Sequence, residues 1–385
     1  VGGAPGKPGL LSFMQAVEGL LGTALDNPIV DGNFAPVSEE ISAPQLEVLE
    51  GTVPADFPDG FYIRNGPNPQ FPTTSTTSPF GRSVHHWFEG DGMLHQVRFR
   101  QGAASYKNRF IRGSGFLREQ AAGEPLARPV MQTSPPAGLI NVLSNQEVFG
   151  AGGKDASNTN VMWHAGRLLA MMEGAQMPLQ ICPEDLSVLG SVDFGAAGGE
   201  GGGGGTGLPS FTAHPKVDPR TGELLYAAWS IKDAQDGRVG IHAGIVGPDG
   251  VLRHSTEVPS ADRNTFMHDT AITENFLVIT DFPLTIDVGR LFYSEEGMMS
   301  FQHDAPARIG LMPRGGSDVQ QWFDVSSGYG FHLMSAFEDG DDVIVRGVYA
   351  DSVVLDHYEW KADGSLDRAE AVSKFFSGGR KASGI

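Results

Sequence analysis

After about residue 45 the chain is divided into short apolar stretches, each bounded by glycine, proline, aspartate or asparagine. Apolar runs of this length, rich in Val, Ile, Leu and Phe, predict β-strands. Turn signals such as "GPDG" (247–250) and "EDGDD" (338–342) recur at intervals that suit an antiparallel meander. The clearest predicted strands are "GFYIRNGP" (60–67), "MLHQVRFR" (93–100), "GRLLAMM" (166–172), "ELLYAAWS" (223–230), "NFLVITDF" (275–282) and "DVIVRGVY" (342–349). The pattern therefore predicts an all-β fold for residues 46–385.

One helical period stands out, near the start of the chain. In "LLSFMQAVEGLLGTAL" (10–25), apolar residues recur at helical spacing: Leu10, Phe13, Met14, Val17 and Leu21. Two interpretations stay open, a helix that rests on a membrane surface and a helix that packs on the body of the protein. The segment has no Lys or Arg, which disfavours adsorption to anionic lipid and favours packing. We expect residues 1–45 to be a helical or extended segment that precedes the β domain.

Charge and cysteine usage exclude several classes of function. The 385 residues include 27 Lys+Arg and 46 Asp+Glu, a formal net charge of −19, which opposes binding to nucleic acid. Cys182 is the single cysteine, so an intrachain disulfide framework and a cysteine-rich metal site are both excluded. A metal would need histidine or carboxylate ligands. No apolar run approaches the roughly 18 residues that a membrane-spanning helix requires.

Three of the eleven histidines share one setting. His214, His268 and His332 each stand near an apolar stretch, and the first two precede Pro215 and Asp269, which restrict the backbone or offer a hydrogen bond. The three are 54 and 64 residues apart, somewhat more than the roughly 40–50 residues of common propeller blades. Neutral imidazoles from separate blades would hold a borderline divalent ion and leave positions open for oxygen or substrate. A shared metal site is one hypothesis from this spacing, and unrelated structural roles are the alternative.

The other histidines have ordinary interpretations. Neighbouring residues of a strand point to opposite faces, so His85 and His86 are poorly placed to bind one ion. We expect structural or solvated roles for His85, His86, His95, His164, His242, His254, His303 and His357. The glycine-rich segment 195–207 lacks the Lys-Ser/Thr of a phosphate-binding loop and is expected to be a surface linker.

Six longer motifs resemble the successive signatures of the carotenoid cleavage oxygenase family, in the family's order and over about residues 25–360. They are "GFYIRNGPNPQF", "HHWFEGDGMLHQVRF", "NTNVMWHAGRLLAMME", "FTAHPKVDPRTGELLYAAWS", "MHDTAITENFLVITDFPL" and "YGFHLMSAFEDGDDVIV". The resemblance implies a seven-bladed β-propeller capped by helices and loops, with ferrous iron, Fe(2+), held on its axis by four histidines.

The resemblance also assigns roles to individual residues. His214, His268 and His332 match the first three iron ligands. Glu173 matches the first of the glutamates that accept hydrogen bonds from ligating imidazoles and fix their orientation. The alternative for Glu173 is an ordinary exposed acid in a turn.

The chain departs from the family at its C-terminal end. The motif that carries the fourth histidine of the family has no counterpart after His332, and the only later histidine is His357, in "VVLDHYEW". We therefore expect one or more C-terminal blades to be missing from residues 46–385, and the fourth ligand with them.

The function implied is that of a non-haem iron dioxygenase. Such an enzyme adds dioxygen across a conjugated double bond of a carotenoid or apocarotenoid and splits it into two carbonyl products. The alternatives are cleavage of a stilbene, isomerisation of a retinoid ester, and an inactive propeller that only binds an apolar ligand or a protein partner. The expected partners are an apolar polyene and dioxygen, with peripheral membrane contact but no transmembrane segment. The expected location is the plastid or the cytoplasm, in soluble or peripherally membrane-associated form.

Overall fold

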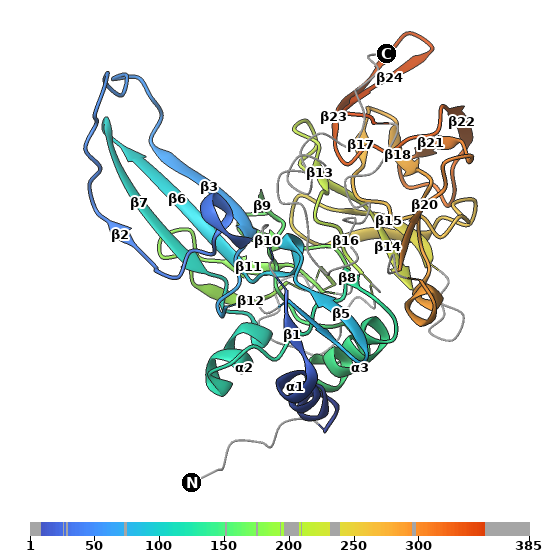
Figure 1. Ribbon diagram of the computed structural model, residues 1–385. Helices are drawn as coiled ribbons and strands as arrows, with labels where there is room; N and C mark the ends of the chain where they lie inside the picture. The colour runs from blue at the N-terminus through green and yellow to red at the C-terminus, as the bar shows by residue number, and fades with distance from the viewer. Residues whose placement is uncertain are drawn as a thin grey trace.

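The computed structural model describes most of residues 9–350, and most of its ordered backbone is antiparallel β-sheet (Figure 1). Inside that range it leaves out residues 26, 28–29, 73–74, 151, 175, 193, 196–207, 209, 232–238 and 295–297. All six of the strands predicted above are confirmed. They are β3 (Gly60–Pro67), β6 (Gly92–Arg100), β10 (Arg167–Met171), β14 (Leu224–Ile231), β18 (Phe276–Asp281) and β24 (Asp342–Gly347).

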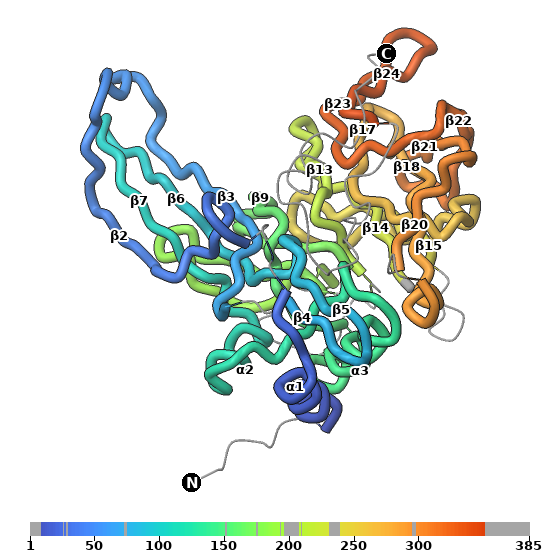
Figure 2. Tube along the Cα trace, in the orientation of Figure 1, coloured from blue at the N-terminus to red at the C-terminus, as the bar shows by residue number. Residues whose placement is uncertain are grey.

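Successive sheets follow one another along the chain as the blades of a propeller. Four have four strands each, in the orders β2-β7-β6-β3, β12-β11-β10-β9, β13-β14-β15-β16 and β17-β18-β21-β22, and β23-β24 form a pair. The colour of the trace advances from sheet to sheet, so neighbouring sheets come in chain order (Figure 2). Strand β3 contacts β9, and β17 contacts β23, across neighbouring sheets. This is the predicted all-β propeller architecture.

The other strands of these sheets vary greatly in length. They are β2 (Ser42–Ala43), β7 (Ala103–Phe110), β9 (Asn160–His164), β11 (Leu179–Ile181), β12 (Val188–Ser191), β13 (Lys216–Val217), β15 (Val239–Val246), β16 (Leu252–Glu257), β17 (Ala271–Ile272), β21 (Ala307–Pro313), β22 (Gln321–Val325) and β23 (Leu333–Asp339). The predicted turn "EDGDD" joins β23 to β24, and Gly340 takes the φ of 62° that this tight hairpin needs. A separate pair is formed by β19 (Leu284–Ile286) and β20 (Met299–Phe301).

The core lies between the sheets, and β14 shows why its sequence is apolar without a break. Alternate side chains of a strand point to opposite faces, and both faces of β14 are covered. One face packs against β10 of the preceding sheet, through Leu224, Tyr226, Ala228, Leu169 and Met171. The other packs against β18 of the following sheet, through Leu225, Ala227, Leu277 and Ile279. Each sheet is therefore held by apolar contact with the next.

Three helices gather at one end of the molecule, beside a smaller sheet (Figure 1). They are α1 (Gly9–Leu21), α2 (Ser114–Ala122) and α3 (Ala137–Phe149), and the sheet has the order β1-β4-β5-β8. Its strands are β1 (Thr23–Ala24), β4 (Thr76–Ser78), β5 (Gly81–Val84) and β8 (Gln132–Thr133). Short 3₁₀ turns, η2 (Gly32–Phe34), η3 (Trp87–Glu89) and η4 (Val288–Phe292), complete the described elements.

Helix α1 packs on the body, but its buried face differs from the predicted one. Leu11 and Met14 are fully buried, and Leu11 packs in a cluster near α3. Phe13 and Leu21, both predicted to face the core, are 50% and 64% exposed. The inward face of α1 carries Leu11, Met14 and Glu18, and Glu18 pairs with Arg128, so a polar contact helps to set which face is buried. Strands β1 and β2 come from residues 1–45 and join larger sheets, while the domain boundary at residue 45 stays a prediction.

Helices α2 and α3 have no apolar period that sequence analysis could find. The most buried residues of α3 are small or polar, with Asn141 and Ser144 both fully buried. The Asn141 amide donates to the Ser83 hydroxyl at 2.9 Å and to the Pro129 carbonyl at 2.7 Å. Hydrogen bonds therefore hold this face of α3 against the protein, and hydrophobic patterning cannot reveal such a helix.

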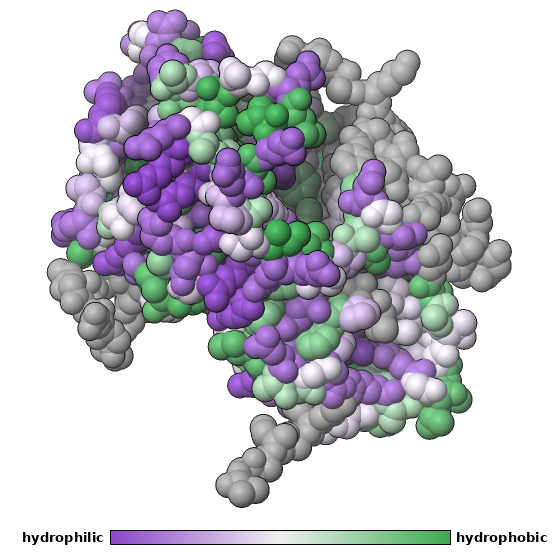
Figure 3. Space-filling model, turned by 90° about the vertical axis from the view of Figure 1, so that its left-hand side faces the viewer, coloured by the Kyte–Doolittle hydropathy of each residue, from purple (hydrophilic) through white to green (hydrophobic). Residues whose placement is uncertain are grey.

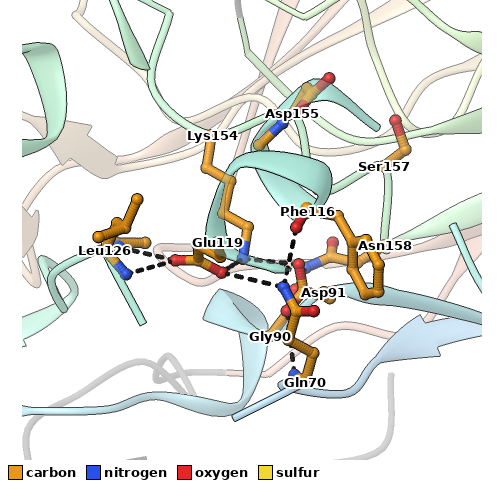
Figure 4. Close-up of polar contacts among 12 residues, drawn as sticks. Gln70, Gly90, Asp91, Phe116, Glu119, Leu126, Lys154, Asp155, Ser157 and Asn158 are labelled. Atoms are coloured by element: carbon orange, nitrogen blue, oxygen red, sulfur yellow. Dashed lines mark hydrogen bonds and ion pairs between the residues drawn. The ribbon is translucent and has the colours of Figure 1, made fainter. Parts of the chain in front are cut away.

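Lys154, in the loop before β9, is buried between two carboxylates (Figure 4). Its ammonium lies 2.6 Å from Asp91 Oδ1 and 2.6 Å from Glu119 Oε2, and the three side chains are only 11%, 4% and 3% exposed. Burial acts to lower the pKa of Lys154, but the two carboxylates outweigh it and raise that pKa. We call Asp91, Glu119 and Lys154 the buried ionic cluster. It joins α2 to the loops that precede β6 and β9.

On the face of the molecule shown in Figure 3, hydrophilic side chains predominate and hydrophobic residues gather in a few places. Among the helices that the structure describes, none combines the length and apolar character that a bilayer span needs. The predicted linker at 195–207 lies almost wholly outside the described residues, as does His357.

Candidate metal centre

The three histidines singled out by their spacing each stand just before the first strand of a sheet. His214 precedes β13, His268 precedes β17 and His332 directly precedes β23. The first strand of a propeller blade is its innermost strand, so a residue that leads into it reaches the centre of the ring. A histidine therefore occupies the same position, just before the first strand, in three successive blades.

The structure brings these three imidazoles together. The ring centroids of His214 and His268 are 4.5 Å apart, those of His214 and His332 4.9 Å, and those of His268 and His332 5.1 Å. One nitrogen from each ring lies within 4.8 Å of the others, and the Nε2 atoms of His268 and His332 are 3.3 Å apart. Within the described residues, no other group of three or more histidine, cysteine or acidic side chains converges in this way.

Glu173, in the loop after β10, touches this cluster from the preceding blade. Its Oε1 atom lies 2.9 Å from His268 Nδ1, and both side chains are 11% exposed. The alternative of an exposed turn acid does not describe its surroundings. Glu173 therefore lies where it can accept a proton from His268 Nδ1, and that tautomer would place the lone pair of His268 on Nε2, 3.3 Å from His332 Nε2.

The surroundings keep two of the imidazoles neutral. Burial, followed by the neighbouring His268 and His332 rings, lowers the pKa of His214 from 6.5 to about 2. Burial and His268 also lower the pKa of His332. For His268 burial acts in the same direction, but the Glu173 carboxylate outweighs it and raises the pKa.

The donor set fits a divalent transition metal. Nε2 of His214 is buried and has no hydrogen-bond partner among the described residues. A buried ring nitrogen without a partner is costly, and a metal ion would satisfy it. Three converging imidazoles, with His268 deprotonated, would suit a borderline ion such as iron, cobalt or zinc. The Glu173 carboxylate lies 2.9 Å from His268 Nδ1, where the outer partner of a ligating histidine commonly lies.

The sequence marked Asp269 only as a neighbour of His268 that offers a hydrogen bond, and it did not show that Asp269 is buried or which groups it meets. Its only local signal is its place between His268 and the apolar stretch that follows. A position in sequence does not show which distant groups a carboxylate will meet.

Several of the remaining histidines have the structural roles expected of them. His86 caps η3 by accepting the Phe88 N–H, and His95 Nδ1 lies 2.8 Å from the Tyr106 hydroxyl. His164 and His254 contact backbone carbonyl oxygens at 3.2 and 2.9 Å. His85 is buried near the cluster of Asp91, Glu119 and Lys154, and its Nε2 has no partner in the described part of the chain.

Lowering the pH from 7 to 5 is expected to reduce the free energy of unfolding more in the wild type than in His85→Gln. The expected difference between the two losses is about 2 kcal/mol. Burial, together with the charge of Lys154, lowers the pKa of His85 from 6.5 to about 4. Because the folded-state pKa lies below the unfolded one, the contribution of His85 is complete above pH 6.5 and is lost as the pH falls towards 4. Urea unfolding at both pH values measures the difference, with the exposed His303→Gln as control. Parallel losses in all three proteins would refute the prediction.

Comparison with known proteins gives the family. The model of the family described as RPE65, retinal pigment epithelial membrane protein, matches residues 34–380. A carotenoid cleavage oxygenase of Mycobacterium tuberculosis is 32% identical over 374 residues, which cover 86% of this chain and 66% of that protein. The chain belongs to the carotenoid cleavage oxygenase family. A carotenoid 9,10(9',10')-cleavage dioxygenase 1 of Pisum sativum is 30% identical over 84% of this chain and 57% of its own length.

Solved structures agree on the fold. The crystal structure of a lignostilbene dioxygenase from Pseudomonas brassicacearum matches with a TM-score of 0.66 and 26% identity, over 90% of this chain and 66% of that one. The chain, as a member of the carotenoid cleavage oxygenase family, spans 57–66% of the length of these relatives.

Proposed function

We propose that this chain carries the metal centre of a non-haem Fe(2+) dioxygenase, which cleaves a conjugated double bond of a carotenoid or apocarotenoid into two carbonyl products. The convergence of His214, His268 and His332 carries the proposal. Relatives named for carotenoid cleavage support the choice of substrate class.

In the proposal, the histidines and Glu173 have different roles. His214, His268 and His332 would hold Fe(2+) through neutral ring nitrogens, and Glu173 would keep His268 in the tautomer that binds. When bound, the iron supplies the activation of dioxygen beside the double bond. The low pKa of His214, caused by its burial, means that protons do not compete for this ligand near neutral pH.

Aromatic side chains make one side of the site apolar. The ring centroid of Phe331 lies 5.1 Å from that of His268, edge-on, and that of Phe266 lies 6.0 Å away in a stacked arrangement. Phe266 belongs to a buried cluster that also contains Phe282 and Tyr329, with Phe331 packed against it. In the proposal these rings exclude water from the metal and give a polyene a surface on which to lie.

The test is an oxygen-dependent cleavage assay with the purified chain. Protein loaded anaerobically with Fe(2+) is exposed to air with a carotenoid, an apocarotenoid or a hydroxylated stilbene. We expect loss of polyene absorbance and two carbonyl products that carry label from isotopic dioxygen. The same protein loaded with Zn(2+), and an anaerobic sample, are the controls. Stoichiometric iron with all three substrates unchanged would count against the proposal and favour an inactive propeller that only binds.

Cleavage of a stilbene is the second candidate. The observation that favours it is the match to the lignostilbene dioxygenase structure at a TM-score of 0.66. Turnover of the stilbene alone in the same assay would select it. Contact of α1 with a membrane surface, and a plastid or cytoplasmic location, stay predictions.

A further inference from the structure

The carboxylate of Asp269 is bonded to the chain segments that carry all three histidines. Asp269 directly follows His268, and its Oδ1 atom accepts from Lys216 Nζ at 2.6 Å, where Lys216 is two residues beyond His214. Its Oδ2 atom accepts the N–H of Leu333, the residue after His332, at 2.8 Å. Asp269 is only 4% exposed. One buried side chain thus touches three segments from three different sheets.

Backbone ladders hold the spacing of these segments only in part, and Tyr329, which donates to the Phe266 carbonyl at 3.0 Å, links two of them but not the third. Strands β13 and β17 are only two residues long, so few ladder hydrogen bonds fix the residues that lead into them. The histidines are also 54 and 64 residues apart, and local backbone geometry cannot set distances between them. The hydrogen bonds of the buried Asp269 carboxylate are short, at 2.6 and 2.8 Å, and they tie all three segments to one side chain.

We propose that Asp269 is a positioning residue, which sets the distances among His214, His268 and His332 and thereby the affinity and geometry of the metal site. Its oxygens accept from the N–H groups of Thr270 and Leu333 and from the Lys216 ammonium, and it is not among the side chains whose ligand atoms converge. The inference rests on the proposed function to the extent that the three histidines bind a metal. It adds the residue that couples their segments.

The test compares Asp269→Asn with the wild type in titrations with Co(2+). Asparagine keeps the shape of the side chain but replaces one acceptor oxygen with a donor, so the bond to either Lys216 or Leu333 is lost. Outer partners of metal ligands contribute roughly 10–100-fold to affinity. We expect the Co(2+) affinity to fall by that factor and the visible Co(2+) spectrum to change shape, because the spectrum reports coordination geometry. A purely structural role would lower the unfolding temperature and leave affinity and spectrum unchanged.

Two further variants sharpen the test. Asp262→Asn alters an exposed aspartate that pairs with Arg308. Its Co(2+) affinity and spectrum are expected to equal those of the wild type. Lys216→Met removes one of the donors to Asp269. Since Lys216 acts through Asp269, the double variant should lose less affinity than the sum of the two single losses.

A readout without metal separates this inference from the proposed function. In the metal-free protein, Asp269→Ala is expected to accelerate amide hydrogen exchange at Leu333, whose N–H it no longer binds. A wild type that fails to bind Co(2+) would overturn the proposed metal centre, while exchange at Leu333 would still test the link. Wild-type affinity and spectrum in Asp269→Asn, or unchanged exchange at Leu333 in Asp269→Ala, would overturn the inference alone.

Discussion

Replacing His268 with alanine is expected to abolish metal retention by this chain. His268 contacts the Glu173 carboxylate through Nδ1, and its Nε2 lies 3.3 Å from that of His332. It is therefore in contact with both another proposed ligand and the buried carboxylate. Loss of an outer partner alone costs 10–100-fold in affinity, and loss of a ligand is expected to cost more than about 100-fold. The variant also leaves the buried Glu173 carboxylate without its imidazole. Metal content after dialysis and Co(2+) titration measure the effect.

The control for this variant is His254→Ala. His254 contacts the Gly316 carbonyl through Nε2 and is not part of the histidine cluster, so its loss removes an imidazole without touching the site. It is expected to retain the metal of the wild type. Full occupancy in His268→Ala would remove His268 from the ligand set. Equal losses in both variants would show that the effect comes from general destabilisation.

Replacing Lys154 with methionine is expected to lower the free energy of unfolding by about 3–5 kcal/mol. Methionine fills similar space, but it leaves Asp91 and Glu119 facing each other in a buried setting without a cation. Burial already raises the pKa of Asp91, and removing the ammonium takes away the largest opposing effect, so that the Gln70 N–H remains. Denaturation by urea, followed by circular dichroism, measures the change.

Two comparisons isolate the charge effect in the buried ionic cluster. Arg98→Met breaks an exposed ion pair with Glu184 and is expected to cost less than about 1 kcal/mol. Adding Asp91→Asn and Glu119→Gln to Lys154→Met removes the uncompensated charges, and it is expected to recover more than half of the loss. Glutamine at 119 can still accept the N–H groups of Leu126 and Ala127. A Lys154→Met variant as stable as Arg98→Met would show that the cluster contributes little.

The strands could be read from the sequence because their local pattern follows directly from their burial. A strand covered on both faces, such as β14, must be apolar at nearly every position, and "ELLYAAWS" is. The spacing of His214, His268 and His332 likewise reflects a position that recurs before the first strand of three sheets. These features are local, or repeat along the chain, so the order of residues records them.

Tertiary structure alone decided which polar groups meet. Helix α3 escaped detection because its buried face mixes small and polar residues, and Asn141 holds it through hydrogen bonds to Ser83 and Pro129. The partners of Asp269 and Lys154 outside their own loops lie 35 to 64 residues away along the chain. Nothing in the types of these residues marks which of them will pair. Which carboxylate pairs with which ammonium depends on how whole sheets pack. An apolar side chain is stabilised on any covered face, so its burial can be predicted from the local pattern. The sequence therefore determined where the strands and the three histidines stand, and the fold determined how far apart the histidine rings are and what holds them there.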